Sequence, residues 1–250
     1  MYKDFTIDGY SELLKTAIRN NYSFVDFNEY FLLKGDGKLP EKTCILRHDI
    51  DADMDAALQL ATIESALGVK STYFLMFRSP VYNLFSRSNF TMANKILELG
   101  HKVALHYDAN YLFNPDDIER KVEVELNCLN QLFNIDSNVV SFHQPDNFIL
   151  ENKISFSGII NTYDKNQFND VTYFSDSNKN WKIEHPLKIF NSNMYQHIQL
   201  LIHPMWWAWP ENYSTRDVWI KTIKKNFNTN LKQVVETEGA FGDPVTIEIH

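Results

Sequence analysis

Five apolar, strand-like segments of this 250-residue chain end on a histidine or an aspartate. They are Cys44–Asp51, Val103–His106, Val139–His143, Tyr173–Asp176 and Leu200–His203. In barrels of alternating strands and helices, the carboxyl ends of parallel strands meet at one face, where the chemistry takes place. We therefore expect these polar residues to converge on one pocket, a layout typical of metal-dependent hydrolases.

Helical patterns lie between the strand-like segments. Asp53 is a good N-cap for a helix that stops at Gly68, and Gly100 stands where the left-handed cap of a second helix would lie. A third helix is predicted to start at Asn114–Pro115. Weaker patterns predict short strands near residues 159–160 and 171–174. Repeated strand-helix units predict an α/β fold, either a (β/α) barrel or a doubly wound sheet.

The length and the apolar fraction of 44% suit one large α/β domain. We expect a single domain over residues 1–250 with a core at about 43–207. Residues 1–42 are predicted to form an N-terminal cap on the side of the barrel, and residues 215–236 a C-terminal amphipathic helix.

Composition excludes several classes of function. A net charge of −8 without a basic stripe argues against nucleic acid as a partner. No apolar run approaches the roughly 20 residues of a membrane span, and the amino terminus does not read as a signal peptide. Cys44 and Cys128 offer neither a disulfide framework nor a metal knuckle. We expect a soluble, cytoplasmic protein, and the sequence leaves its oligomeric state open.

The aspartates of the first segment suggest a metal site. Asp49 and Asp51 are two residues apart, so they lie on the same face if the strand continues. Two close carboxylates repel each other unless a cation lies between them. One could bind a divalent ion, with zinc the first choice, while the other acts as general base on a metal-bound water. His106, His143 and His203 are the candidate imidazole groups.

The motifs resemble those of a known family. RHDID at 47–51, GHKVALH at 100–106, SFHQP at 141–145 and LIH at 201–203 occur in the order found in the polysaccharide deacetylase (NodB-like) family. The closest likeness is to divergent members of the WbmS type, associated with bacterial surface-polysaccharide biosynthesis. The segment YFSDS at 173–177 followed by Trp181 adds to this likeness. The resemblance covers about residues 43–207.

This resemblance implies a distorted (β/α) barrel of the NodB-like type. It also implies metal-assisted removal of an N-acyl group, acetyl or formyl, from an amino sugar or glycan in O-antigen or capsule biosynthesis. By position, Asp49 would be the catalytic base, Asp51 and His106 metal ligands, and His203 the acid toward the leaving amine.

The chain departs from the family pattern at three places. Ile50 separates the two aspartates, which are usually adjacent. Asn110 occupies the position of the second metal histidine, so we predict His143 as the replacement ligand and Asp108 as the fallback. His143-Gln144-Pro145 stands where an arginine before proline is usual.

Further residues are candidates for the pocket. Asp176 could orient a histidine or bind a sugar hydroxyl, and a turn-forming role is equally compatible. Trp206 and Trp207 could form a wall for a sugar ring or a hydrophobic plug. Because side chains alternate along a strand, either Arg47 or its neighbour His48 points into the pocket. Predicted substrate contacts are Arg47, Tyr107, Asp108, Trp206 and Trp207.

Two other functions remain open. The replacement at Asn110 would suit an inactive carbohydrate-binding or scaffold protein on the same barrel. The pair His48-Asp49 would suit a metal-dependent phosphoesterase, which requires cationic groups near the pocket.

Overall fold

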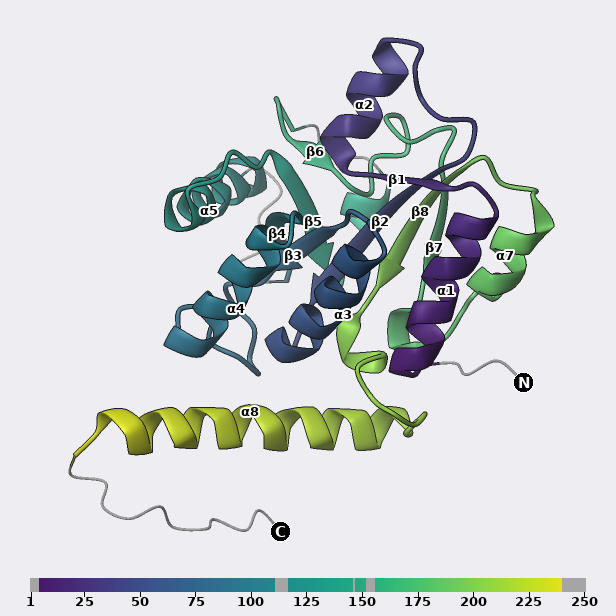
Figure 1. Ribbon diagram of the computed structural model, residues 1–250. Helices are drawn as coiled ribbons and strands as arrows, with labels where there is room; N and C mark the ends of the chain where they lie inside the picture. The colour runs from purple at the N-terminus through teal and green to yellow at the C-terminus, as the bar shows by residue number, and fades with distance from the viewer. Residues whose placement is uncertain (1–4, 111–116, 146, 152–155, 240–250) are drawn as a thin grey trace.

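Parallel strands curl into an incomplete barrel in the computed structural model, which describes residues 5–110, 117–145, 147–151 and 156–239 (Figure 1). In these residues the sheet has eight strands in the order β6-β5-β4-β3-β2-β8-β7, with β1 paired to β2, and every pair is parallel. The strands are β1 (Ser23–Val25), β2 (Thr43–Ile50), β3 (Thr72–Leu75), β4 (Lys102–Asp108), β5 (Val139–His143), β6 (Ile160–Asn161), β7 (Thr172–Ser175) and β8 (His197–Ile202). This confirms the predicted single-domain, distorted (β/α) barrel.

The barrel is open between β6 and β7, where no strand pairing joins the two edges in the described part of the chain. Interior side chains bridge the gap instead. Gln199 Nε2 on β8 donates to the Thr162 carbonyl at 3.1 Å, and the Arg47 guanidinium on β2 donates to Thr162 Oγ1 and Tyr163 Oη. Buried polar contacts therefore take the place of a backbone ladder at the seam.

Helices cover the outside of the sheet (Figure 1). α3, α4 and α5 lie over one side of it, and α1 and α7 pack against each other near β7 and β8. The helical elements are α1 (Ile7–Arg19), α2 (Phe27–Gly35), α3 (Met54–Ala66), α4 (Arg87–Glu98), α5 (Ile118–Phe133), α6 (Asn147–Leu150), η1 (Ser177–Lys179), α7 (Pro186–Ser192), η2 (Pro204–Trp206) and α8 (Thr215–Thr237).

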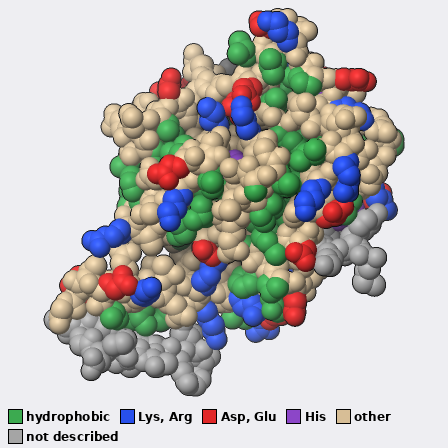
Figure 2. Space-filling view, in the orientation of Figure 1, with side chains coloured by type: hydrophobic (Ala, Val, Ile, Leu, Met, Phe, Trp, Pro, Cys, Tyr) green, Lys and Arg blue, Asp and Glu red, His purple; other side chains and the backbone are tan. Residues whose placement is uncertain are grey.

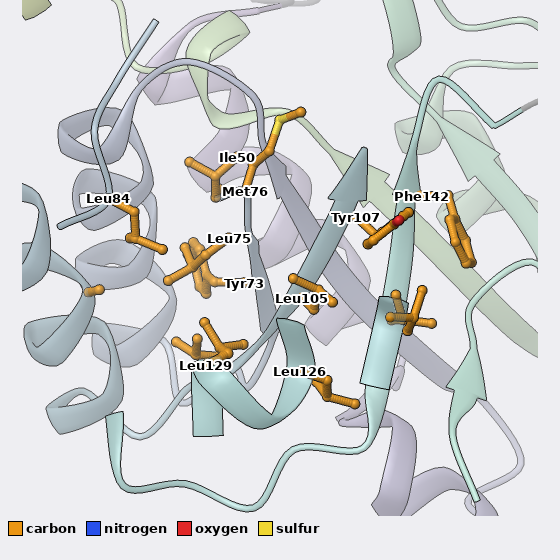
Figure 3. Close-up of a cluster of buried hydrophobic side chains, with 14 of the residues drawn as sticks. Ile50, Tyr73, Leu75, Met76, Leu84, Leu105, Tyr107, Leu126, Leu129 and Phe142 are labelled. Carbon is orange, nitrogen blue, oxygen red and sulfur yellow. The ribbon is translucent and has the colours of Figure 1, made fainter. Parts of the chain in front are cut away.

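An apolar core fills the space between the sheet and α3, α4 and α5 (Figure 3). Alternate strand residues supply it, such as Tyr73 and Leu75 on β3 and Leu105 and Tyr107 on β4. Leu129 is one of the residues that α5 contributes from its buried stripe. Because neighbouring strand residues face opposite sides, the intervening positions point into the barrel.

Local signals in the sequence account for the helix boundaries. The Asp53 carboxylate accepts from Ala56 N at 3.0 Å, which confirms the predicted N-cap of α3. Gly100, with φ of +91°, follows the C-cap of α4 in the left-handed conformation that glycine adopts without strain. The predicted helix start at Asn114–Pro115 lies outside the described residues. The short strands predicted near residues 171–174 and 159–160 correspond, within one residue, to β7 and β6.

Residues 5–42 contribute more than a covering layer. β1 pairs with Thr43–Ile45, the first half of β2, on the edge where β3 later pairs with Arg47–Ile50. α1 packs on α3 and α7 outside the barrel. The amino-terminal segment predicted as a cap thus includes one strand of the sheet.

Candidate active site

Residues from four strand ends line one cavity of about 430 Å³ at the carboxyl side of the barrel. Asp49 and Asp51 come from β2 and the residue after it, as expected for two side chains on the same face. His106 comes from β4, and His143 from β5. His203 directly follows β8. The cavity is completed by Met76, Pro80, Val81, Phe142, Gln144, Pro145, Tyr163, Ser177, Asn178, Leu201, Trp206, Thr215 and Trp219.

Two imidazoles converge on one oxygen of Asp51. His106 Nε2 lies 3.1 Å and His143 Nδ1 3.2 Å from Asp51 Oδ1. The two rings meet edge to face, with centroids 5.3 Å apart. One ligand atom from each of the three residues lies within 4.8 Å of the others, a spacing that could hold a metal ion.

Charge within this group favours the ionised carboxylate. Burial alone would raise the pKa of Asp51, but hydrogen bonds from His106 and His143 outweigh it and hold that pKa well below its usual range. Burial would lower the pKa of His143, but its hydrogen bond to the Asp51 carboxylate outweighs burial and raises this pKa. The imidazoles here compensate a buried negative charge, as a cation would.

The donor set also fits a divalent ion chemically. Two imidazole nitrogens and one carboxylate oxygen are common ligands of zinc and of other first-row metals. His106 Nδ1 is buried without a hydrogen-bond partner, and it lies 3.9 Å from Asp49 Oδ2. Asp51, His106 and His143 are therefore the residues that would hold the predicted metal, and they leave Asp49 outside the ligand group.

Asp49 is held on both oxygens by other partners. Arg47 donates to Oδ2 at 2.9 Å, and Ser141 Oγ lies 3.2 and 3.1 Å from the two oxygens. Burial would raise the pKa of Asp49, but the Arg47 charge, with those of His106 and His203, lowers it. Asp49 is therefore an ionised acceptor with a fixed orientation.

A second carboxylate orients His203. The Asp176 Oδ1 atom lies 2.6 Å from His203 Nδ1, and the His203 backbone N–H also donates to Asp176. Burial would lower the pKa of His203, but the charge of Asp176 outweighs it and raises this pKa to about 9. Nε2 lies 3.8 Å from Asp51 Oδ2. The imidazole is thus protonated at neutral pH with Nε2 near the proposed ligands.

Of the predicted substrate contacts, Trp206 lines the cavity. Its Nε1 is buried without a partner. Trp207 is buried and donates from Nε1 to Asp176 Oδ2 at 2.8 Å, so it fixes the carboxylate that orients His203. These two tryptophans therefore have different roles: Trp206 forms part of the cavity wall, and Trp207 positions Asp176.

The structure does not bring the other three predicted contacts to the cavity lining. Arg47 is fully buried against Asp49 and the barrel seam. Tyr107 is buried in the outer core against Phe142, because β4 continues beyond His106 and alternation turns the next side chain outward (Figure 3). Asp108 accepts from the Asn110 backbone N–H at 3.1 Å.

The structure also shows which way the side chains of Arg47 and His48 point. Arg47 points into the barrel, whereas His48 points outward, with Nε2 2.8 Å from Glu64 on α3. Both side chains are completely buried. His48 therefore belongs to a separate polar cluster outside the barrel and not to the cavity.

Sequence reasoning missed several residues of the site, among them Ser141, Tyr163 and Trp219. Ser141 lies two positions before His143 on β5, so strand alternation alone could have identified it. Tyr163 and Trp219 line the cavity from the loop after β6 and from α8. No local motif marks these two, because only the closure of the barrel brings them to the site.

Comparisons with known proteins gave the following results. No family model and no curated protein matches the chain. Among solved structures, the deacetylase PplD from Streptococcus pyogenes in complex with acetate is 13% identical, with a TM-score of 0.46 over 86% of this chain and 85% of that chain.

Two further structures show similar values. The chitin deacetylase from the fungal pathogen Colletotrichum lindemuthianum is 15% identical, with a TM-score of 0.43 over 73% of this chain and 81% of that chain. BA3943 from Bacillus anthracis, described as a CE4 family pseudoenzyme, is 13% identical, with a TM-score of 0.41 over 76% and 62%. Activity depends on the residues of the site and not on a shared fold.

In the described residues, no helix has both the length and the hydropathy to span a bilayer.

Proposed function

We propose that the protein is a metal-dependent hydrolase that removes an N-acyl group, acetyl or formyl, from an amino sugar. The observation that carries this proposal is that three groups in the cavity are suited to three different chemical roles. Asp51, His106 and His143 form one group, the ionised Asp49 lies outside it, and the protonated His203 has Nε2 3.8 Å from Asp51 Oδ2. Amide hydrolysis needs these three elements, an electrophile, a base and an acid.

The chain's own residues would divide the proton transfers. A divalent ion held by Asp51, His106 and His143 would polarise the amide carbonyl and lower the pKa of water. Asp49, kept ionised by Arg47 and oriented by Ser141, accepts the proton of the attacking water. His203 Nε2, kept protonated by Asp176, donates a proton to the departing nitrogen. The products are a carboxylic acid and a free amine.

The cavity lining favours a sugar without a phosphate at the reacting end. Among the described residues that line it, none is a lysine or an arginine. The phosphoesterase alternative requires such groups, so this lining argues against it. Trp206 and Trp219 supply apolar rings for a pyranose.

The proposed biological setting is based on the sequence. The likeness to WbmS-type members supports an intermediate of O-antigen or capsule biosynthesis as the substrate, and the two free cysteines fit a reducing cytoplasm. The sugar could be attached to a nucleotide, to a lipid or to a free glycan, and the substrate screen should include all three.

The test is release of acetate or formate from a panel of N-acylated amino sugars by the zinc-loaded protein. We expect turnover by the wild type that is abolished in Asp49→Asn, with bound metal retained. Asparagine is preferable to alanine here because it keeps a polar group beside the buried Arg47. Asp51→Asn and His106→Ala should lose both metal and turnover.

Asp36→Asn is a matched control, since this exposed carboxylate lies at the end of α2, away from the cavity. It should behave as the wild type. A metal-loaded wild type that binds N-acyl sugars but releases no acid would overturn the proposal in favour of a carbohydrate-binding protein. Equal turnover in Asp49→Asn would remove Asp49 as the base.

A further inference from the structure

Helix α8 lies across the end of the barrel at which the strands finish (Figure 1). Few of its residues are buried: Val218 and Thr222 pack on the body. Asn226 Nδ2 donates to the carbonyl of Ala52 at 2.6 Å, and Lys225 Nζ lies 2.5 Å from Asp53. These contacts determine which side of the helix faces solvent.

An apolar stripe runs along the solvent side. Ile220, Ile223, Phe227 and Val234 are 40%, 51%, 37% and 39% exposed. Their spacings of three, four and seven residues place them on one side of a helix, away from the side that carries Val218 and Thr222. Four large apolar side chains in a row on a solvent face indicate a surface that another apolar phase covers.

The charge of α8 is opposite to that of the rest of the protein. The helix carries five lysines and arginines against two acidic residues, a net charge of +3, whereas the whole chain carries −8. Lys and Arg side chains gather with apolar ones in the region of α8 (Figure 2). Beside the stripe, a shallow groove is lined by Trp209, Lys221, Lys224, Lys225, Asn228, Thr229 and Lys232.

We propose that the exposed face of α8 binds the surface of an anionic lipid bilayer. An apolar stripe that enters the acyl boundary, flanked by cations for the headgroups, is the pattern of helices that lie in a membrane interface. Two copies of α8 placed face to face would bring two helices of charge +3 together, so the charge favours an anionic surface over a second copy. The contact is peripheral, since α8 is fixed to the body by Lys225 and Asn226.

This inference has a consequence for the cavity. Thr215 and Trp219, in the first turns of α8, line it. Binding through α8 would therefore hold the cavity close to the headgroup layer, within reach of a sugar attached to a lipid. The lipid contact itself stands independently of the proposed hydrolysis, and its test needs no turnover.

The test is flotation of the full chain with phosphatidylcholine vesicles, with and without phosphatidylglycerol. We expect binding that requires the anionic lipid and falls with increasing salt. The double variant Ile223→Ser/Phe227→Ser should bind at least about tenfold more weakly, because two apolar side chains leave the acyl boundary. Arg216→Glu/Lys221→Glu should lose a similar factor.

Leu32→Ser, an exposed apolar position on α2, is the matched control and should bind as the wild type. Circular dichroism confirms that each variant is folded. Equal binding to both kinds of vesicle, or wild-type binding by the Ile223→Ser/Phe227→Ser variant, would overturn the proposal. So would a protein that ignores vesicles and sediments as a dimer through α8, a result that would assign the face to a second copy.

Discussion

Two clusters of carboxylate and histidine lie on opposite sides of β2, and their carboxylates differ in what surrounds them. On the inner side, Asp51 meets His106 and His143 beside Asp49. On the outer side, Glu64 of α3 meets His48 and His101. Both clusters combine carboxylates with histidines, so the kinds of group present do not distinguish a candidate catalytic site from a structural one.

The carboxylate of the outer cluster is buried and saturated with hydrogen bonds. Glu64 is completely buried and accepts from Tyr10 Oη, from Ser71 Oγ at 2.5 Å and from Tyr73 Oη at 3.0 Å. These contacts tie α1 and α3 to the sheet. A carboxylate with this many donors stabilises the fold and has no lone pair left for a ligand.

The inner cluster differs in its access. Its members line a cavity, where a ligand can reach them. A buried nitrogen without a partner occurs in both clusters, His106 Nδ1 in the inner one and His48 Nδ1 in the outer one, so such atoms do not distinguish the two. The comparison teaches that open geometry, and not residue type, marks the candidate site.

The largest expected effect is on turnover through Asp51. Asp51→Asn should lower kcat/KM by more than about 10³-fold, because the metal contribution is lost together with the carboxylate. Its free energy of unfolding should fall much less than that of a Glu64 variant. Steady-state kinetics and urea denaturation on the same sample measure both quantities, and a large loss of stability with retained turnover would erase the contrast between the clusters.

Glu64→Ala tests the outer cluster. It should lower the free energy of unfolding by about 3–5 kcal/mol, because it strips buried donors of their shared acceptor. Turnover per folded molecule should remain near that of the wild type. Glu98→Ala, at an exposed position of α4, is the control and should change the unfolding free energy by less than about 0.5 kcal/mol. A Glu64 variant of wild-type stability would show that the cluster does not hold the fold.

Asp176→Asn separates orientation of the acid from metal binding within the inner cluster. It should reduce kcat by about 10²- to 10⁴-fold, because His203 loses the carboxylate that fixes its tautomer and supports its charge. Bound metal, measured by elemental analysis, should be unchanged. Loss of the metal in this variant would place Asp176 among the ligands or their supports.

The smallest effect concerns the pH dependence of stability. Burial would raise the pKa of Glu64, but the charges of His48 and His101 outweigh it and lower that pKa in the folded state. Such a group contributes stability that is fully present above its unfolded pKa of about 4.3 and is lost as the pH falls through the folded value. The difference in unfolding free energy between wild type and Glu64→Gln should therefore shrink as the pH falls below about 4. Urea titrations at each pH measure it, and a difference that grows toward acid pH has the wrong sign.

Much of the fold could be predicted because strand and helix signals are local. The run that ends at His143 and the caps at Asp53 and Gly100 each depend on a few neighbouring residues. β1 is only three residues long, so its pairing with β2 depends on a tertiary contact that no local pattern encodes.

The site was best predicted where a residue closes a strand. Asp51, His106, His143 and His203 came together as their positions indicated. Tyr107, predicted as a substrate contact, points away from the cavity because β4 runs two residues past His106 and strand alternation turns this side chain outward. Arg47 bridges the open seam of the barrel through Thr162 and Tyr163, and no sequence motif predicts this seam.

The most direct test is the metal content of the protein purified without chelators or nickel resin, measured beside His106→Ala. If the inner cluster is a metal centre, the wild type should carry close to one divalent ion per chain, and the folded variant should carry none. A wild type that remains free of metal after zinc is added back, with its fold intact, would contradict the central claim.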